Sequence, residues 1–478
     1  MLEKSSVFCI VHILLTKRRG VLIAQVLSGV LLPFCLFLAG GYFTFKIGTY
    51  FLRYPKKTVL GMLYSQGQGG TSPVRALTVA LAGTLGVGNI AGVATAIMLG
   101  GAGAVFWMWV AALLVMALKY AEIVLAQLTR QCEGDSCVTA HGGAMYYIKE
   151  AFRGRLGRVL ASVFAVLCVL CTLTLGTMIQ ANAAAEALSG VFGVPPLITG
   201  VVMGGIAVII LWRGAARVEG VCAILVPFVC LLFCVLSFAV LFLQRAALPA
   251  AFGAIFRGAF TLQGGMGGIA GVVTNKAVRY GVSRGLVSNE AGCGTAPIAH
   301  AAANAKSPAQ QGFWGIFEVF VDTVLLCTLT ALVILVSGVE QSGGGVFTAI
   351  SAFGAVLGDV APPLVAISVA FFAFATVLCW SHYGSEAVYY LTKHRNAPYF
   401  LLGGALLATV LGSIAAPTLV WELTDIVLAV MTLLNLAALV FSRHRIEAET
   451  KVFFKGNAVG DGASTSRKKR TKTKTGDS

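Results

Sequence analysis

One stretch of the chain combines an apolar character with residue types that can bind a small charged ligand. The segment ALAGTLGVGNIAGVATAIMLGG, residues 80–101, has several glycines and two polar side chains, Thr84 and Asn89, near its middle. Glycine in a helix interior costs about 1 kcal/mol relative to alanine, and lipid leaves no backbone polar group unpaired. An apolar span that weakens its own centre therefore indicates irregular backbone that is buried in protein or lines a wet cavity.

A helix interrupted at membrane depth offers two kinds of ligand. Free amides at the start of one half attract a carboxylate, and free carbonyls at the end of the other half coordinate a cation. Gly86 and Gly88 allow the backbone to approach a ligand closely, and Thr84 and Asn89 add side-chain oxygens of the kind that a small, hard cation prefers. Residues 76–121 include no Asp or Glu, so we expect no proton relay centred there.

Two other interpretations use the same glycines. The motif GVGNIAG has the wrong spacing for a dinucleotide-binding loop, and no acid follows it at about 20 residues. Close packing of helices through small residues is the stronger alternative. A second interrupted segment, 261–296, favours transport, because paired broken helices are the best sequence indication of a binding site at the membrane midplane.

Further polar side chains fall inside apolar runs. A buried amide at Gln180 needs a partner, and both interhelical hydrogen bonding and substrate contact satisfy that need. Thr376 and Trp380 share a helix face, and the polar run WSHYGSE that begins at Trp380 and Ser381 suits a cavity wall. A tryptophan near a helix end is also typical of a membrane interface.

Asp322 and Glu122 are ionisable groups within predicted spans, and Lys119 lies beside Glu122. Ionisable groups inside a membrane are functional candidates. Structural pairing with Lys or Arg explains them equally well.

The composition supplies the scaffold that these side chains need. The 478 residues are 58% hydrophobic and 11% charged, against about 25% charged residues in an ordinary soluble domain, so the chain is a polytopic membrane protein. Taking about 20 apolar residues per span, we predict about eleven transmembrane helices. They lie near 21–45, 74–99, 104–128, 159–185, 196–212, 221–243, 253–300, 314–338, 362–391, 399–420 and 422–441. The seventh is too long and too polar for one simple helix, so we expect a broken span plus a re-entrant or cytoplasmic helical stretch.

Charge orients the chain. The formal net charge of +16 is concentrated in alternate loops and in the tail RKKRTKTK, residues 467–474, which follows the positive-inside rule and does not indicate nucleic-acid binding. We expect an N-terminal extension (1–20), a transmembrane bundle (21–441) and a disordered basic cytoplasmic tail (442–478). The C-terminus would be cytoplasmic and the N-terminus outside, in the cell inner (cytoplasmic) membrane, although Lys17–Arg19 opposes this locally.

The sequence offers little for catalysis or for a transition metal. Cys132, Cys137 and His141 share a polar loop, but a fourth ligand is missing and their spacing matches no zinc pattern. We find no nucleophile–base–orienter set, and so we expect no enzyme, no catalytic residues and no cofactor.

Several long motifs resemble the alanine or glycine:cation symporter family. They are the segment from residue 80 through KYAE, then GGAMYYI, YGVSRGLVSNEAGCGTAPIAHAAA and DTVLLCTLTALVIL. The similarity extends from about residue 30 to about residue 440. The resemblance implies a LeuT-like 5+5 inverted repeat with discontinuous helices, a sodium ion or, less often, a proton as the coupling ion, and alanine, glycine or in some members D-alanine as the substrate.

The resemblance also implies roles for individual residues. By the match of GVGN to the unwound helix of related symporters, the Val87 and Gly88 amides face the substrate carboxylate, and the Ala82 and Leu85 carbonyls face a sodium ion with Thr84 and Asn89 nearby. Gln180 matches a family position that lines the substrate pocket. Thr376 and Trp380 line the same pocket. The expected substrate-binding residues are Gly86, Val87, Gly88, Asn89, Gln180, Thr376 and Trp380, and the expected cation ligands are Ala82, Thr84, Leu85, Asn89 and Ser381.

Some residues depart from the family pattern. Val87 replaces a frequent threonine, His382 a frequent tyrosine and Cys293 a frequent leucine or methionine, and Glu386 is shifted by one position. The sequence thus predicts a sodium symporter of small neutral amino acids. A proton-coupled carrier using Glu290, Asp322 or His382 is the alternative within transport, and a passive channel or a nutrient receptor is the alternative outside it.

Overall fold

The computed structural model describes residues 31–65, 67, 70–133, 139–260, 276–339, 344–394, 396, 398–415 and 417–455. Within these ranges the chain is almost entirely helical, and its one sheet is an antiparallel hairpin of β1 (Gln131–Glu133) and β2 (Thr139–His141). The predicted all-α bundle is confirmed.

The helices follow the chain in two groups, separated by residues 261–275. The first group is α3 (Leu32–Phe43), α4 (Thr49–Arg53), α5 (Pro55–Leu63), α6 (Pro73–Thr84), α7 (Ala91–Gly100), α8 (Gly103–Thr129), α9 (Ala144–Phe152), α10 (Gly154–Leu173), α11 (Gln180–Phe192), α12 (Pro196–Trp212), α13 (Ala215–Leu243) and α14 (Leu248–Ala259). The second group is α16 (Lys276–Asn289), α17 (Ala296–Ala301), α18 (Pro308–Val319), α19 (Thr328–Ser337), α20 (Gly345–Leu357), α21 (Ala361–Thr392), α22 (Pro398–Ile414) and α23 (Pro417–Phe441). Turns of π-helix join three pairs of these helices, at Thr44–Gly48, Thr174–Ile179 and Phe320–Cys327.

Local sequence explains where key helices begin. Ser72 caps α6, since its side chain accepts a hydrogen bond from the Arg75 N–H at 3.3 Å and proline follows at the first helical position. Ser307 caps α18 in the same way through the Gln310 N–H, again with proline next. Serine before proline is a strong helix start, because the hydroxyl satisfies a free amide and the proline has none to satisfy.

In the described part of the chain, seven helical stretches are long and apolar enough to cross a membrane. The bent pair Pro73–Thr84 and Val87–Gly100 adds an eighth, and two shorter apolar helices, Pro196–Trp212 and Tyr399–Ile414, fall where further spans are expected. The chain is therefore a multi-pass membrane protein. The number of about eleven spans stays a prediction.

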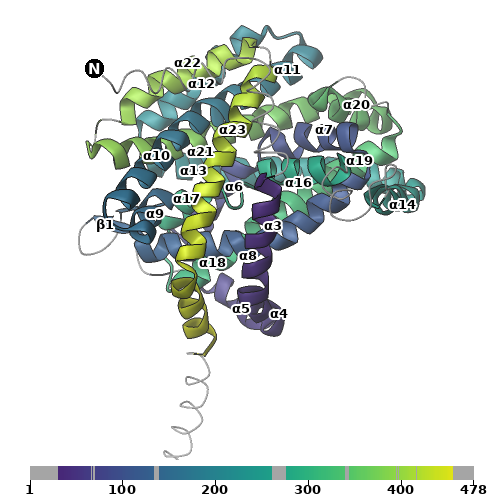
Figure 1. Ribbon diagram of the computed structural model, residues 1–478. Coiled ribbons are helices and arrows are strands. Elements are labelled where there is room, and N and C mark those ends of the chain that lie inside the picture. The colour runs from purple at the N-terminus through teal and green to yellow at the C-terminus, as the bar shows by residue number, and fades with distance from the viewer. Residues whose placement is uncertain are drawn as a thin grey trace, which may run out of the picture.

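Two long helices organise the bundle. α8 packs against α3, α16 and α18, and α21 packs against α6, α10, α11 and α13. The apolar windows of Gly103–Thr129 and Gly345–Thr392 are each 72% buried, against 39% for Ala215–Leu243, which therefore turns much of its surface to lipid. Figure 1 shows α23, in yellow, running beside α3 across one face of the bundle, so that the two ends of the described chain cover α8 together.

The structure refines two expected boundaries. The span predicted at 253–300 is divided, because α14 ends at Ala259 and a separate broken helix occupies 276–301, while residues 261–275 lie outside the described residues. Residues 443–455 are helical, although they fall in the segment expected to be a disordered tail, and the rest of that tail lies outside the described residues. The N-terminal extension, 1–20, lies outside them too.

Candidate functional site

The predicted break in residues 80–101 is present. α6 ends at Thr84, the next two residues leave the helix, and a single 3-10 turn (Val87–Asn89) precedes α7. The two halves are bent by 62°. Since this backbone is buried, its polar groups must find partners in the protein or in a ligand.

A second break lies between α16 and α17. Glu290, Gly292 and Gly294 all have positive φ, at 51°, 86° and 80°. Glycine adopts this conformation readily, but a residue with a long side chain does so at a cost, and such residues cluster at functional sites. The interruption predicted for 261–296 is thus present near the C-terminal end of its described part, 276–296, and residues 261–275 lie outside the described residues.

The two breaks meet at Asp322. A Cβ added at Gly88 would lie 3.3 Å from the Ser288 Cα, so the two backbones are in contact there. Asn89 Nδ2 donates to Asp322 Oδ1 at 2.7 Å, and Ser288 Oγ donates to Asp322 Oδ2 at 2.9 Å. Asp322 belongs to the π-helical turn Phe320–Cys327, a distortion that occurs frequently at functional sites.

The Asn89 side chain is only half satisfied. Its Nδ2 donates to Asp322, but its Oδ1 is buried and accepts no hydrogen bond from the residues that the structure describes. An unpaired buried acceptor costs about 1–3 kcal/mol. An oxygen ligand left free beside a carboxylate suits a cation.

Bare backbone at Gly86 faces two polar side chains. A Cβ there would lie 2.8 Å from Thr376 Oγ1 and 2.9 Å from Gln180 Oε1, so no larger residue fits without movement. The Val87 N–H, expected to face a carboxylate, donates to Gln180 Oε1 at 3.1 Å in this structure. The Gln180 oxygen therefore accepts the hydrogen bond that the Val87 N–H could otherwise donate to a ligand carboxylate.

Two carbonyls near the end of α6, those of Ala82 and Leu85, do not accept the hydrogen bond that a continuous helix would give them. The Gly86 N–H donates to Thr84 O and not to Ala82 O, and the Asn89 N–H donates to Gly86 O and not to Leu85 O. Thr376 Oγ1 lies 2.9 Å from Ala82 O. Thr376, expected to contact substrate, is thus placed beside an expected cation ligand.

Trp380 and Ser381 lie elsewhere in the site. Trp380 is fully buried, donates from Nε1 to Glu290 Oε1 at 2.9 Å and packs its Cβ against Gly176. The Ser381 Oγ is buried with no hydrogen-bond partner in the described chain. It makes no hydrogen bond to the first break, and the Thr84 hydroxyl points back along α6 to Ala80 O at 3.4 Å.

A carboxylate on α8 holds the second break from the other side. Glu122 Oε1 accepts from the Gly294 N–H at 2.9 Å and from Asn435 Nδ2, which also donates to Gly292 O at 2.8 Å. Tyr147 in turn donates to Asn435 Oδ1 at 2.5 Å. Glu122 thus satisfies backbone that the helix no longer satisfies, a structural role that differs from the pairing with Lys or Arg considered for this residue, because Lys119 pairs with Glu318.

Lys119, one turn before Glu122 on α8, forms a buried ion pair with Glu318. Its Nζ lies 3.1 Å from Glu318 Oε1 and donates to Asn289 O at 2.9 Å. The other Glu318 oxygen lies 3.2 Å from His300 Nε2. All of these side chains are fully buried, so the network fixes α8, α17 and α18 around the second break.

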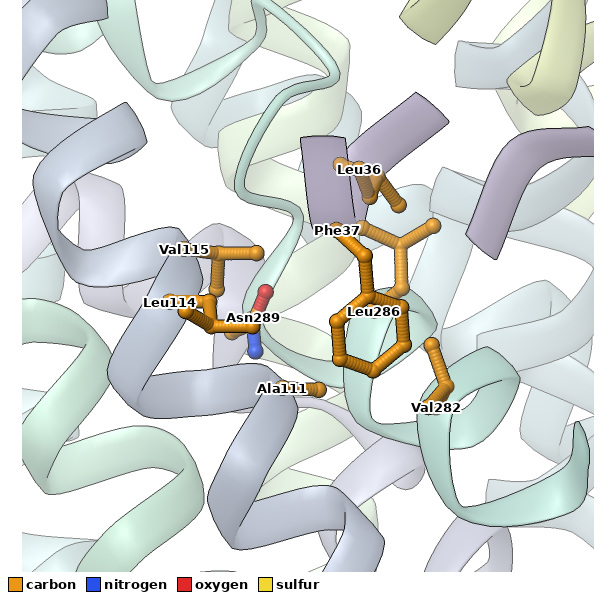
Figure 2. Close-up of a pocket in the computed structure, with 8 residues that line it drawn as sticks. All are labelled: Leu36, Phe37, Ala111, Leu114, Val115, Val282, Leu286 and Asn289. Carbon is orange, nitrogen blue, oxygen red and sulfur yellow. The ribbon is translucent and has the colours of Figure 1, made fainter. Parts of the chain in front are cut away.

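Figure 2 shows a narrow crevice at the N-terminal side of the second break, between α3, α8 and α16. Its cavity volume is about 10 Å³, roughly the room for one water molecule, and Asn289 is the one polar residue among the eight that line it. The Asn289 side chain already donates to Thr323 Oγ1 and accepts from the Ala291 N–H. This crevice does not suit a zwitterion, and the polar groups that could bind one lie at the breaks.

The donors at the breaks are amide, hydroxyl, carbonyl and carboxylate oxygens. Among the residues that the structure describes, no group of three or more His, Cys, Asp or Glu is arranged to hold a metal ion. Where the two breaks meet, oxygen ligands with the one carboxylate of Asp322 suit a hard cation of low charge better than a transition metal.

Comparison with known proteins places the chain in a family. The model of the sodium:alanine symporter family matches residues 17–467. The chain belongs to this family. It is 36% identical to the sodium/alanine symporter AgcS of Methanococcus maripaludis, over 81% of this chain and 85% of that protein. It is 33% identical to the amino-acid carrier protein AlsT of Bacillus subtilis, over 78% of each.

The fold agrees with the assignment to the sodium:alanine symporter family. The structure of MhsT in complex with L-phenylalanine aligns with a TM-score of 0.53 and 13% identity, over 79% of this chain and 90% of that one. The LeuT-like fold predicted from the sequence is confirmed. The chain is a transporter in a family of sodium-coupled amino-acid symporters and not an enzyme.

In this member of the sodium:alanine symporter family, the sequence singled out most of the first break but only part of its surroundings. Asp322 was a candidate for proton coupling or for structural pairing but was not among the predicted site residues, and Ser288 was missed. Ser288 stands directly before Asn289 and Glu290 in the second interrupted segment. Its place beside a break was the only available signal, since a serine in an apolar helix is common.

Proposed function

We propose that this protein imports small neutral amino acids, namely alanine, glycine and D-alanine, by symport with sodium across the cytoplasmic membrane. The observation that carries the proposal is the unpaired Asn89 Oδ1 beside Asp322, next to bare backbone at Gly86. An unpaired oxygen and, two residues before it, an amide that is held only by the Gln180 side chain fit an ion and a carboxylate that bind together. The C-terminus would lie in the cytoplasm and the N-terminus outside.

The substrate carboxylate would replace the Gln180 oxygen at the Val87 N–H. Val87 and Gly88 lie at the start of the second half of the broken helix, whose free amides favour negative charge. Gln180 would then turn its amide group to the substrate. Gly86 leaves the room that the small zwitterion needs.

Sodium would bind at the released carbonyls of Ala82 and Leu85 together with Thr376 Oγ1. The Thr376 hydroxyl can direct its proton to Phe372 O, 3.0 Å away, which frees its lone pairs for the ion. Asn89 Oδ1 and Asp322 form a second candidate position. Thr84 and Ser381 stay predicted cation ligands, and no hydrogen bond to the other predicted ligands supports them.

The ion and the substrate would stabilise each other because they share one unwound segment. Each ligand that binds lowers the cost of ordering the backbone for the other, so the sodium gradient drives uptake. Alternating access would then move both ligands across the membrane together.

Uptake by proteoliposomes tests the proposal. Labelled alanine should accumulate above its equilibrium level with an inward sodium gradient and should not accumulate when choline replaces sodium. Equal uptake in both conditions excludes sodium coupling, and no uptake of any small amino acid excludes the function. Accumulation driven by a proton gradient without sodium would support the alternative, a proton-coupled carrier, for which the buried carboxyl groups of Glu290 and Asp322 are the candidates.

A further inference from the structure

One carboxylate joins the second break to the helix that carries Trp380. Glu290 Oε1 accepts from the Trp380 Nε1–H at 2.9 Å, and Glu290 Oε2 accepts from the Thr295 hydroxyl at 2.8 Å. Glu290 and Thr295 lie at the two ends of the break, so a single side chain spans it. All three residues are at least 98% buried, with exposed fractions of 2%, 0% and 0% for Glu290, Thr295 and Trp380.

The Trp380 indole has few ways to move while this bond exists. Its Cβ packs against Gly176, where an added Cβ would lie only 2.3 Å away, and its carbonyl accepts from Thr172. The ring also meets Tyr383 edge-on, with centroids 5.7 Å apart. The bond to Glu290 sets the direction of the ring, because a buried indole N–H that loses its acceptor has no water to replace it.

Trp380 stands one helical turn from Thr376, whose Oγ1 lies beside the Ala82 carbonyl and the Gly86 backbone. The Trp380 Cβ packs against Gly176, four residues before Gln180, so Trp380 lies about one turn beyond both side chains that face Gly86. A ring in that position would border the side chain of the proposed substrate, and a larger substrate side chain would have to displace it.

We propose that Glu290 is a positioning residue that sets the upper size limit of the substrate by holding the Trp380 ring. This inference rests on the proposed function and deepens it, since it names what restricts the substrate class to small side chains. Glu290 acts through its hydrogen bonds and not through its charge. Its left-handed φ of 51° is the backbone conformation that directs the carboxylate across the break.

The geometry separates a hydrogen-bonding role from a charge or proton role. In Glu290→Gln, the amide oxygen can accept from Trp380 and the amide nitrogen can donate to Thr295 Oγ1, so both bonds are retained without charge. In Glu290→Ala both bonds are lost. Trp380→Phe removes the N–H that Glu290 holds and also makes the ring smaller, so it tests whether the ring limits substrate size but not whether Glu290 does.

The experiment measures the inhibition of labelled alanine uptake by amino acids of increasing size, from glycine through alanine to valine and leucine. Full-length protein in proteoliposomes with a sodium gradient is used for wild type and each variant. We expect Glu290→Ala and Trp380→Phe to raise the affinity for leucine relative to alanine by about tenfold, the effect of one buried hydrogen bond. Glu290→Gln should keep the wild-type ratio of leucine affinity to alanine affinity. The double variant Glu290→Ala with Trp380→Phe should have the same ratio as Trp380→Phe alone, because no N–H is left for Glu290 to hold.

The matched control is Glu150→Ala, which removes an exposed glutamate paired with Arg445 at 2.6 Å and should leave the ratio unchanged. An unchanged ratio in Glu290→Ala would overturn the inference, as would a Glu290→Gln ratio that matches a raised Glu290→Ala ratio. If Glu290→Ala does not fold, Glu290→Met, which keeps the side-chain volume but has no oxygen acceptor, is measured in its place and should raise the ratio in the same way. Failure of wild-type protein to take up alanine would refute the proposed function itself, which is a different outcome.

Discussion

Asn89 and Asp322 form a 2.7 Å hydrogen bond between Nδ2 and Oδ1, although 233 positions separate them in the chain. The bond fixes the asparagine amide so that its oxygen is left free. Because the partner is a carboxylate, the free oxygen lies in a negative environment. The pair is therefore arranged to attract a cation at the point where the two broken helices meet.

Replacing Asn89 should weaken ion and substrate binding together. Asn89→Ala removes the unpaired oxygen and should raise the sodium concentration for half-maximal alanine uptake by at least about tenfold, since one lost ligand costs more than about 1.4 kcal/mol. Asn182→Ala is the control, because that amide only donates to Gly412 O and Ala415 O. A sodium dependence that is unaltered in Asn89→Ala would refute the cation assignment.

Asp322→Asn separates sodium coupling from proton coupling. The change keeps the size of the side chain and removes its charge, so sodium binding should weaken about tenfold or more while the protein still folds. Uptake is measured against sodium at fixed pH and against pH without sodium. If wild type takes up alanine without sodium at acid pH and Asp322→Asn does not, Asp322 carries a proton and the sodium account is wrong.

Gly86→Ala should abolish transport without unfolding the protein. The new Cβ would lie 2.8 Å from Thr376 Oγ1 and 2.9 Å from Gln180 Oε1, and both atoms belong to the proposed site. Gly92→Ala is the matched control in the same segment, because nothing lies within 4 Å of an added Cβ there. Gly92 lies in the first turn of α7, and a change from glycine to alanine at compatible backbone should stabilise by about 0.4–1 kcal/mol. Equal uptake by the two variants would contradict the proposal that Gly86 lines the site.

Breaking the buried ion pair on α8 should destabilise the protein. Lys119→Met leaves Glu318 and the Asn289 carbonyl without their cation, and removing one partner of a buried pair costs about 3–5 kcal/mol. The midpoint of thermal unfolding in detergent should be lower in Lys119→Met than in wild type. The double variant Lys119→Met with Glu318→Gln should recover part of the lost midpoint temperature. A midpoint equal to that of wild type would show that the pair does not hold the second break.

The first break could be predicted from sequence because its signal is local. Glycines and polar side chains at 83–92 interrupt an otherwise apolar run, and lipid tolerates such backbone only in a protected place. The position of the second break was predicted less precisely than that of the first. The charged residues Lys276, Arg279 and Arg284 interrupt the apolar pattern, although they belong to the helix α16.

The contacts across the bundle could not be predicted. Asp322 and Asn89 meet only because two helix distortions lie side by side. Thr376 and Trp380 share a helix face, yet one lies beside the first break and the other is bonded to the second. A single sequence gives the period of a helix but not which helix it faces.

Equilibrium binding of alanine to the purified protein at several sodium concentrations tests the central claim most directly. If the ion and the substrate share the unwound segment, sodium must increase the affinity for alanine, and alanine must increase the affinity for sodium by the same factor. We predict a factor of about ten or more in both directions. An alanine affinity that is the same in sodium and in choline would contradict the account.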